Sequence, residues 1–223
     1  MASIVYEKNQ QPTTVLFDFD GTIAQTLHLL LYLPQELLRF TALEEITHAE
    51  IDYMRKHGIR KFIKLLQISP LRLPKVLNEL QSLFAEHIQN IPPVEGIAEV
   101  IESLQSNQVK IGIITSNTRE NVEKYLEFHQ LNLFSFIYSD KSVFRKHRVI
   151  EKVLAEQAID KSTACYVGDE TRDITAARKC QIGSVGVTWG FNDRARMEKM
   201  NPDWLLTHPR ELLQFAKAQM LQN

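Results

Sequence analysis

From residue 92 onward, apolar runs typical of buried strands alternate with stretches of helical periodicity. Successive parallel strands need a crossover connection, usually a helix, so this alternation predicts a parallel β-sheet covered by helices on both faces. A chain of 223 residues, 44% of them hydrophobic, can bury such a sheet. The predicted strands are 109–115, 135–139, 163–169 and 184–188, with a short one in DWLLT, and the predicted helices include 118–130, 147–157, 173–180 and 209–221.

A helical block interrupts this pattern near the N-terminus. Residues 14–19 predict a first buried strand, but residues 27–90 carry helical periodicity and almost no strand signal. The stretch 52–66 predicts two helical pieces separated at Gly58. We therefore expect an α/β fold, a Rossmann-like parallel-sheet core domain (1–24 and 92–223) with an inserted all-helical cap domain (25–91).

Acidic and hydroxyl side chains stand where the predicted strands end. Residues i and i+2 of a strand share a face, so Asp18 and Asp20 in the run DFDGT should lie together. Ligands of open α/β sheets bind at the carboxyl ends of the strands, where these residues should meet others. The residues at the ends of the later strands are Thr115, Ser116, Asp169, Glu170 and Asp173.

Such a cluster of carboxylates raises its own pKa values and destabilises the fold unless a cation neutralises it. Hard oxygen ligands suit Mg²⁺, which is the predicted cofactor. Each element also has a simpler interpretation. The Asp-Gly pair occurs in ordinary turns, Thr115 could cap the next helix, and the GDETRD acids could favour a helix N-terminus.

Composition excludes several classes of partner. With 26 basic and 27 acidic residues, the formal net charge of −1 gives no electrostatic basis for nucleic-acid binding. The apolar run at 27–33 is far shorter than the ~20 residues of a membrane span, so no membrane partner is expected. The two cysteines, Cys165 and Cys180, lack metal-ligand spacing and predict buried free thiols in a reducing cytoplasm.

Together, DFDGT, the strand end IIT, a downstream lysine and VGDETRD resemble the four motifs of the haloacid dehalogenase (HAD)-like hydrolase superfamily. The resemblance covers about 14–26 and 92–208. The run VGVTWGFN at 185–192, with the placement and size of the helical insertion, is similar to the phosphoglycolate phosphatase-like branch.

The resemblance implies a catalytic role for the first two acids. Asp18 would be the nucleophile that forms an aspartyl-phosphate, and Asp20 would protonate the leaving oxygen and then accept a proton from water. Mg²⁺ would be held by Asp18, the main-chain carbonyl of Asp20 and Asp169, with Asp173 acting through water. Thr115 and the following residues, Ser116 and Asn117, would donate hydrogen bonds to the phosphoryl oxygens.

The lysine motif leaves two candidates. Lys146 lies 23 positions before Asp169, a spacing that suits the family, whereas Lys141 lies five residues earlier in the preceding loop. We favour Lys146, although the proline that usually follows this lysine is missing here. The acidic residue usual after DGTxA is likewise replaced, by Gln25. In the cap, the basic run RKHGIRK is either a solvated surface or a substrate-binding element, with Arg60 the favoured contact.

The favoured function is hydrolysis of a small phosphorylated metabolite, with phosphoglycolate the leading candidate. A cap over the crevice would exclude larger substrates. A β-phosphoglucomutase-like phosphomutase and a catalytically idle binding module of the same fold remain alternatives. A dehalogenase is not expected, because attack on carbon needs no leaving-group acid at Asp20. A monomer or a homodimer is compatible with the sequence.

Overall fold

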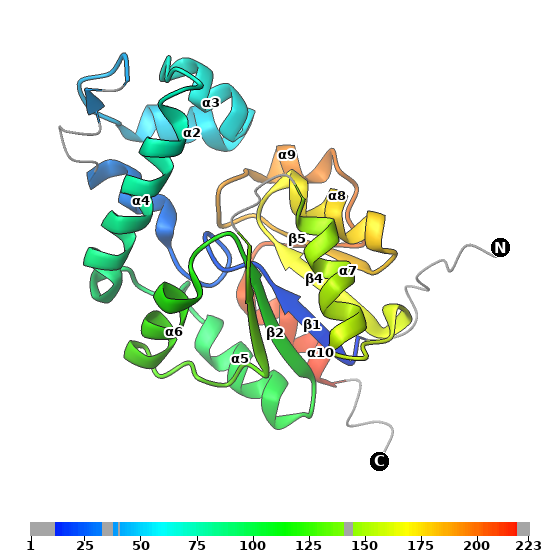
Figure 1. Ribbon diagram of the computed structural model, residues 1–223. Helices are drawn as coiled ribbons and strands as arrows, with labels where there is room; N and C mark the ends of the chain where they lie inside the picture. The colour runs from blue at the N-terminus through cyan, green and yellow to red at the C-terminus, as the bar shows by residue number, and fades with distance from the viewer. Residues whose placement is uncertain (1–11, 33–37, 40, 141–144, 218–223) are drawn as a thin grey trace.

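A single parallel sheet forms the centre of the molecule (Figure 1). The computed structural model describes residues 12–32, 38–39, 41–140 and 145–217. The strand order is β3-β2-β1-β4-β5-β6, and every neighbouring pair is parallel, which confirms the predicted fold class. The strands are β1 (Thr14–Phe17), β2 (Lys110–Thr115), β3 (Phe136–Ser139), β4 (Ala164–Gly168), β5 (Gly183–Val187) and β6 (Trp204–Leu206).

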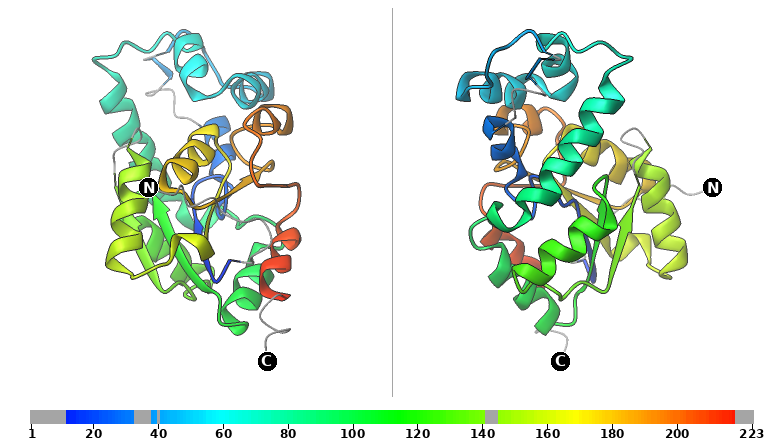
Figure 2. Two further views of the ribbon diagram at one scale, coloured as in Figure 1. Left: turned by 90° about the vertical axis from the view of Figure 1, so that its right-hand side faces the viewer. Right: turned by 60° about the vertical axis from the view of Figure 1, so that its left-hand side comes forward.

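Helices cover both faces of this sheet (Figure 2). Successive residues of β1 point to opposite faces: Val15 and Phe17 join one apolar cluster, and Leu16 joins another. The first cluster includes side chains of α5 (Ile97–Ser106) and α6 (Arg119–Phe128), and the second includes those of α7 (Lys146–Glu156) and α8 (Thr171–Cys180). Because β1 is central and buried on both faces, the residue that follows it lies deep in the molecule.

The helical block forms a cap with its own apolar cluster, in which Met54 and Phe62 are almost fully buried. Its helices are α2 (His48–His57), α3 (Ile59–Leu65) and α4 (Leu73–His87), and they lie above the carboxyl ends of the strands (Figures 1 and 2). Gly58 separates α2 from α3, as predicted, with a φ of +81° that disfavours other residues. Residues 26–32 form a 3₁₀ helix, η1 (Thr26–Tyr32).

The two chain crossings between core and cap run side by side. The Gln25 N–H donates to the Pro92 carbonyl at 3.0 Å, and the Val94 N–H donates to the Ile23 carbonyl at 2.8 Å. These hydrogen bonds tie the outgoing and returning segments together where the sequence suggested the division at 24/25 and 91/92. The division into two domains stays a prediction.

Several boundaries differ from the expected ranges. Helix α7 begins at Lys146 and α8 at Thr171, so Lys146 and Asp173 lie in the first turns of these helices rather than before them. The expected helix at 209–221 is a 3₁₀ helix, η4 (Pro209–Leu213), followed by α10 (Gln214–Lys217), and its remainder lies outside the described residues. Two further 3₁₀ helices are η2 (Ile88–Asn90) and η3 (Lys161–Thr163), and a short helix not predicted is α9 (Arg194–Glu198).

Among the described residues, no helix is both long and apolar enough to cross a bilayer. Cys165 and Cys180 are buried free thiols, as predicted. Burial raises the pKa of the Cys180 thiol to about 12, so this side chain is neutral at physiological pH.

Candidate active site

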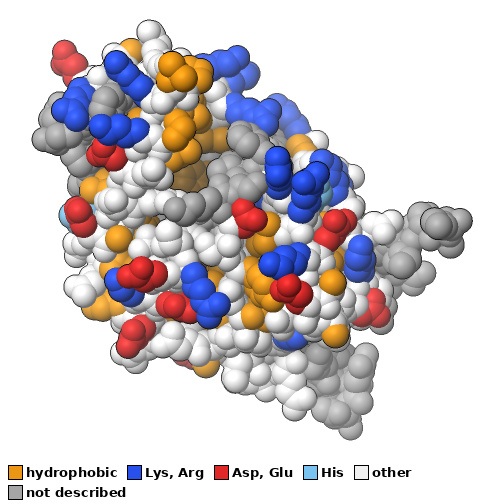
Figure 3. Space-filling view, in the orientation of Figure 1, with side chains coloured by type: hydrophobic (Ala, Val, Ile, Leu, Met, Phe, Trp, Pro, Cys, Tyr) orange, Lys and Arg blue, Asp and Glu red, His pale blue; other side chains and the backbone are white. Residues whose placement is uncertain are grey.

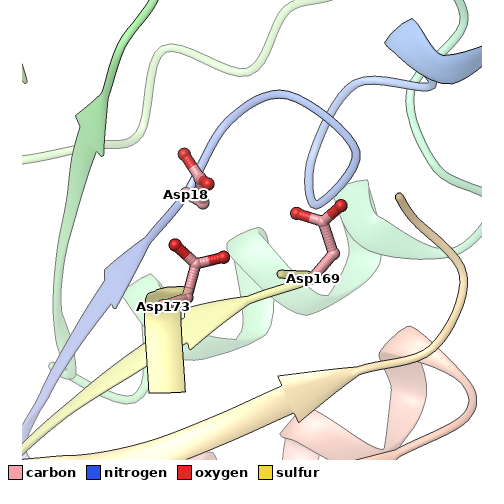
Figure 4. A group of neighbouring side chains, drawn as sticks. All are labelled: Asp18, Asp169 and Asp173. Atoms are coloured by element: carbon pink, nitrogen blue, oxygen red, sulfur yellow. The ribbon is translucent and has the colours of Figure 1, made fainter. Parts of the chain in front are cut away.

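Three buried aspartates converge at the carboxyl edge of the sheet (Figure 4). Asp18 directly follows β1, Asp169 directly follows β4, and Asp173 lies in the first turn of α8. One carboxylate oxygen from each lies within 4.8 Å of the others. The three side chains are 3%, 0% and 0% exposed, so water cannot screen their mutual repulsion.

The Lys146 ammonium neutralises two of these carboxylates. Its Nζ lies 2.6 Å from Asp18 Oδ2 and 2.5 Å from Asp173 Oδ1. Burial would lower the pKa of Lys146, but Asp173 and Asp18 outweigh it and hold the pKa well above its ordinary value. Burial also raises the pKa of the Asp18 carboxyl, against the opposing effect of Lys146. Lys146 therefore stays charged; its rival, Lys141, lies outside the described residues.

A hydroxyl group and a backbone N–H hold the Asp169 carboxylate in place. The Thr22 hydroxyl donates to Asp169 Oδ1 at 2.9 Å, and the Phe191 N–H donates to Oδ2 at 2.6 Å. Gly21 and Gly190 lie against the same carboxylate. A Cβ atom added at either position would come within 2.4 Å or 2.2 Å of Asp169 Oδ2. These two residues are therefore glycines because the Asp169 carboxylate occupies the space of a side chain.

Asp20 has a different environment from Asp18. Its carboxylate accepts hydrogen bonds from the Asn117 side-chain amide at 3.2 and 3.3 Å. Burial, and then the charge of Asp18, raise the pKa of Asp20 from 3.8 to about 7, although the Asn117 hydrogen bond acts to lower it. A general acid needs a carboxyl whose pKa is near 7, as that of Asp20 is, and a nucleophile needs an ionised carboxylate, which the ion pair with Lys146 favours at Asp18.

The end of β2 brings hydroxyl and amide groups close to Asp20 and Lys146. The buried Thr115 hydroxyl accepts a hydrogen bond from the Asn117 N–H at 3.0 Å. Thr115 and Ser116 line a small crevice together with Lys146 and Arg172. The Asn117 side-chain amide donates to Asp20 in this structure, and its contact with the substrate stays a prediction.

The residues present fit a hard divalent cation. Asp18, Asp169 and Asp173 supply carboxylate oxygens, the donor type that such ions prefer, and the glycine contacts with Asp169 fix one of these donors in place. The Asp20 carboxylate is not part of this group among the described residues, and its main-chain carbonyl stays a predicted ligand.

In the cap, Arg55 of the RKHGIRK run contacts the core, and Arg60 stays a predicted substrate contact. Arg60 is exposed on α3, whereas the Arg55 side chain donates to the Thr188 carbonyl at 2.8 Å. The Arg55 carbonyl accepts from the Asp193 N–H at 3.1 Å, and the Arg196 guanidinium lies against Gly58. Arg55 thus joins the cap to the segment after β5.

The aromatic residues after β5 have separate contacts. Trp189 packs against the main core cluster, and its Nε1 donates to the Thr22 carbonyl at 3.1 Å. The Phe191 side chain packs against the apolar cluster of the cap, although its N–H bonds Asp169. Both residues therefore stabilise the loop that holds the carboxylate.

Two residues of the site, Thr22 and Arg172, were not among those predicted from the sequence. Thr22 is the last residue of the DFDGT motif, and its hydroxyl donates a hydrogen bond to Asp169, which lies 147 positions further along the chain. Arg172 stands between two acids in GDETRD, so its place in the sequence was a signal: a basic residue inside an acidic motif. It forms an ion pair of 2.5 Å with Glu170.

Known proteins are similar to this chain over most of its length. Residues 15–187 match the family of haloacid dehalogenase-like hydrolases. The chain is 31% identical over 209 residues to a phosphoglycolate phosphatase of Synechococcus elongatus, covering 93% of this chain and 99% of the relative. It is also 26% identical over 213 residues to the pyrophosphatase PpaX of Bacillus cereus, covering 90% and 94% of the two chains.

Solved structures share the fold. A haloacid dehalogenase-like family hydrolase from Streptococcus pneumoniae superposes with a TM-score of 0.74 at 20% identity, covering 92% of this chain and 98% of the other. A HAD family hydrolase from Deinococcus radiodurans, solved with bound phosphate and sodium, has a TM-score of 0.70 at 19% identity over 93% and 96% of the two chains.

Proposed function

The chain belongs to the haloacid dehalogenase-like hydrolase family and is a phosphatase, and we propose that it hydrolyses a small phosphomonoester by way of an aspartyl-phosphate on Asp18. The observation that carries this proposal is the contrast between two neighbouring carboxyls. Asp18 is paired with the Lys146 ammonium, whereas Asp20 is held by a neutral amide and has a pKa of about 7.

The residues suggest a two-step transfer. An Asp18 oxygen would attack phosphorus while the ester P–O bond breaks, and Asp20 would give its proton to the leaving oxygen. Asp20 would then accept a proton from a water molecule as that water attacks the phosphorus, which releases phosphate and restores the Asp18 carboxylate. Asp20 ends each cycle protonated, as it began.

Asp18, Asp169 and Asp173 would hold Mg²⁺. When bound, this ion would supply positive charge beside the phosphoryl oxygens. Lys146 adds a cation that remains charged, and Thr115 and Ser116 line the crevice where hydroxyl and N–H donors would bind the phosphoryl oxygens. Such an arrangement stabilises the spread negative charge of phosphoryl transfer.

We propose phosphoglycolate as the leading substrate because of the similarity to the Synechococcus enzyme. Basic side chains gather on the cap and on the facing α8–α9 side of the core (Figure 3), and such a grouping of cations would favour small anionic substrates. Exposed members include Lys56 and Arg60 of the cap and Arg194 of α9. The relatives also include a pyrophosphatase, so inorganic pyrophosphate belongs in any substrate panel.

The Asp18→Asn variant tests the proposal. It should lose at least ~10³-fold in turnover of para-nitrophenyl phosphate and phosphoglycolate while remaining folded, because the attacking carboxylate is gone. Asp52→Asn, at an exposed position of α2, is the matched control and should retain full activity. Substantial phosphate release by Asp18→Asn would refute the mechanism. Conversion of a hexose phosphate that depends on a bisphosphate, with little phosphate released, would instead favour the phosphomutase.

A further inference from the structure

Arg172 lies in the same crevice as Lys146, although neither the motif pattern nor the proposed mechanism uses it. It is the second residue of α8, and its neighbours around the crevice include Thr115, Ser116 and Lys146. The Arg172 side chain is 29% exposed, so it is largely enclosed by protein but still reachable from solvent. A guanidinium in this position can meet a ligand that enters the crevice.

Glu170 holds this guanidinium in one orientation. Arg172 Nη2 lies 2.5 Å from Glu170 Oε1, and the Glu170 carboxylate is 12% exposed. The Glu170 backbone is fixed at the start of α8: its carbonyl accepts from the Asp173 N–H at 2.9 Å, and its own N–H donates to Asp173 Oδ2 at 2.9 Å. Because the ion pair with Glu170 orients the guanidinium before a ligand arrives, Arg172 loses little conformational entropy when it binds one.

Lys146 alone does not balance the negative charge that a bound substrate would add, so a second cation would be favourable there. Lys146 already contacts two carboxylates at 2.6 and 2.5 Å, so its single charge is shared before any substrate arrives. An entering phosphate ester brings up to two further negative charges. The planar guanidinium carries five N–H donors, and its geometry matches both a carboxylate and phosphate oxygens, so Arg172 can keep Glu170 and bind a phosphoryl group together.

We propose that Arg172 is a substrate-binding residue that contacts the phosphoryl group from the side of α8, alongside Lys146. This inference rests on the proposed function, because it assigns the crevice to the phosphoryl group of the substrate. It differs from a purely structural ion pair with Glu170, in which Arg172 would only stabilise the first turn of α8.

The test compares Arg172→Ala, Arg172→Lys and Glu170→Gln with the wild-type protein in the presence of Mg²⁺. Arg172→Ala should lower kcat/KM at least ~10²-fold for para-nitrophenyl phosphate and phosphoglycolate alike, because both share the phosphoryl group. Inorganic phosphate, measured by calorimetry, should bind about tenfold more weakly. Arg172→Lys should recover part of the lost kcat/KM and part of the lost phosphate affinity, since lysine keeps the positive charge but lacks the paired N–H donors of the guanidinium.

Two further measurements separate binding from a structural role. Millimolar guanidinium should restore part of the activity of Arg172→Ala, and Glu170→Gln, which keeps the cation, should retain most phosphate affinity. Arg178→Ala, at an exposed position of α8, is the matched control and should behave as wild type. The proposal is overturned if Arg172→Ala binds phosphate as tightly as wild type, or if Glu170→Gln loses as much affinity as Arg172→Ala.

The proposed function and this inference fail in different ways. If the wild-type protein released no phosphate from any ester, the proposed function would be refuted, while the phosphate affinities of the variants would still decide the role of Arg172. If the wild type hydrolyses esters and Arg172→Ala does so equally well, the inference alone is wrong.

Discussion

At the scale of single residues, Asp18 and Asp20 show how position decides the chemistry of one side-chain type. Asp18 ends the central strand and faces the Lys146 ammonium, which favours its ionised form. Asp20 lies two residues further along and faces the neutral amide of Asn117. Burial and then the charge of Asp18 raise the pKa of Asp20 to about 7.

This pKa predicts the pH dependence of catalysis. The protonated Asp20 population falls as the pH rises through about 7, so kcat/KM for a substrate with a poor leaving group, such as phosphoglycolate, should fall about tenfold per pH unit above that value. Asp20→Asn should remove this fall of kcat/KM with rising pH and should lower kcat/KM for phosphoglycolate at least ~10²-fold. Para-nitrophenyl phosphate should lose less, because its leaving group needs no proton. A flat profile for phosphoglycolate from pH 6 to about 9 would contradict the role of Asp20 as the acid.

Two glycines allow conformational strain to be separated from the packing of the site. Gly21 and Gly96 both have positive φ, +77° and +83°. A Cβ atom at Gly21 would come within 2.4 Å of Asp169 Oδ2, but at Gly96 the nearest atom, in Arg210, is 3.9 Å away. Alanine at Gly96 should lower the free energy of unfolding by about 1 kcal/mol through backbone strain, and alanine at Gly21 should lower it further because its Cβ atom also collides with Asp169.

Only Gly21→Ala should also weaken metal binding, by roughly tenfold or more, because it displaces a proposed ligand by a fraction of an ångström. Calorimetric titration with Mg²⁺ measures this effect, and thermal unfolding measures the cost of strain. Equal Mg²⁺ affinity in the two variants would show that Gly21 serves the turn and not the carboxylate.

At the scale of elements, the cap meets the core through α2 and the segment between β5 and α9. Arg55 contributes both a side-chain donor and a backbone acceptor to this contact, and Gly58 allows the Arg196 guanidinium to lie against the cap backbone. The Phe191 side chain adds an apolar contact to the same junction. The loop that holds Asp169 is therefore also the loop that the cap touches.

Arg55→Ala should loosen this junction. Loss of the hydrogen bond to the Thr188 carbonyl should raise amide hydrogen exchange in α2 and in residues 188–193, and should raise KM for small phosphate esters several-fold. Lys56→Ala removes a neighbouring exposed cation and is the matched control. Identical exchange in both variants would mean that the side chain of Arg55 does not hold the cap.

At the scale of the whole molecule, a neutral overall charge conceals strong local charge. The formal net charge is −1, yet three carboxylates, those of Asp18, Asp169 and Asp173, gather in the interior, where Lys146 pairs with two of them and Arg172 pairs with the adjacent Glu170. Burial and the charge of Asp18 raise the pKa of Asp169 well above its ordinary value, so the metal-free protein carries unfavourable electrostatic energy there. A bound divalent cation would relieve it.

Metal removal should therefore change both activity and stability. Excess EDTA should abolish phosphate release, Mg²⁺ should restore it, and Ca²⁺ should substitute poorly because it prefers more ligands at longer distances. At a Mg²⁺ concentration of about 100 Kd, linkage stabilises the native state by about 2.7 kcal/mol, which should raise Tm by roughly 5–10 °C. Asp169→Asn should lose most of this shift. Undiminished activity in excess chelator would refute a metal-dependent mechanism.

Local sequence patterns were enough to predict the class of fold and the edge of the sheet at which the candidate catalytic residues lie. Alternating strand and helix patterns require a parallel sheet, and parallel strands bring their carboxyl ends to one edge, so the convergence of Asp18, Asp169 and Thr115 follows from local patterns. The family motifs carried the same information, because they stand at those strand ends.

Only the tertiary structure decided the partners of each side chain. Lys146 and Asp18 are 128 positions apart, Asn117 and Asp20 are 97 apart, and Arg55 and Thr188 are 133 apart. Periodicity reports which face of an element is buried, but not how a helix is rotated and shifted on the sheet beneath it. That packing turned Asn117 toward Asp20, brought Arg55 against the Thr188 carbonyl, and placed Arg172 beside Lys146 at the crevice.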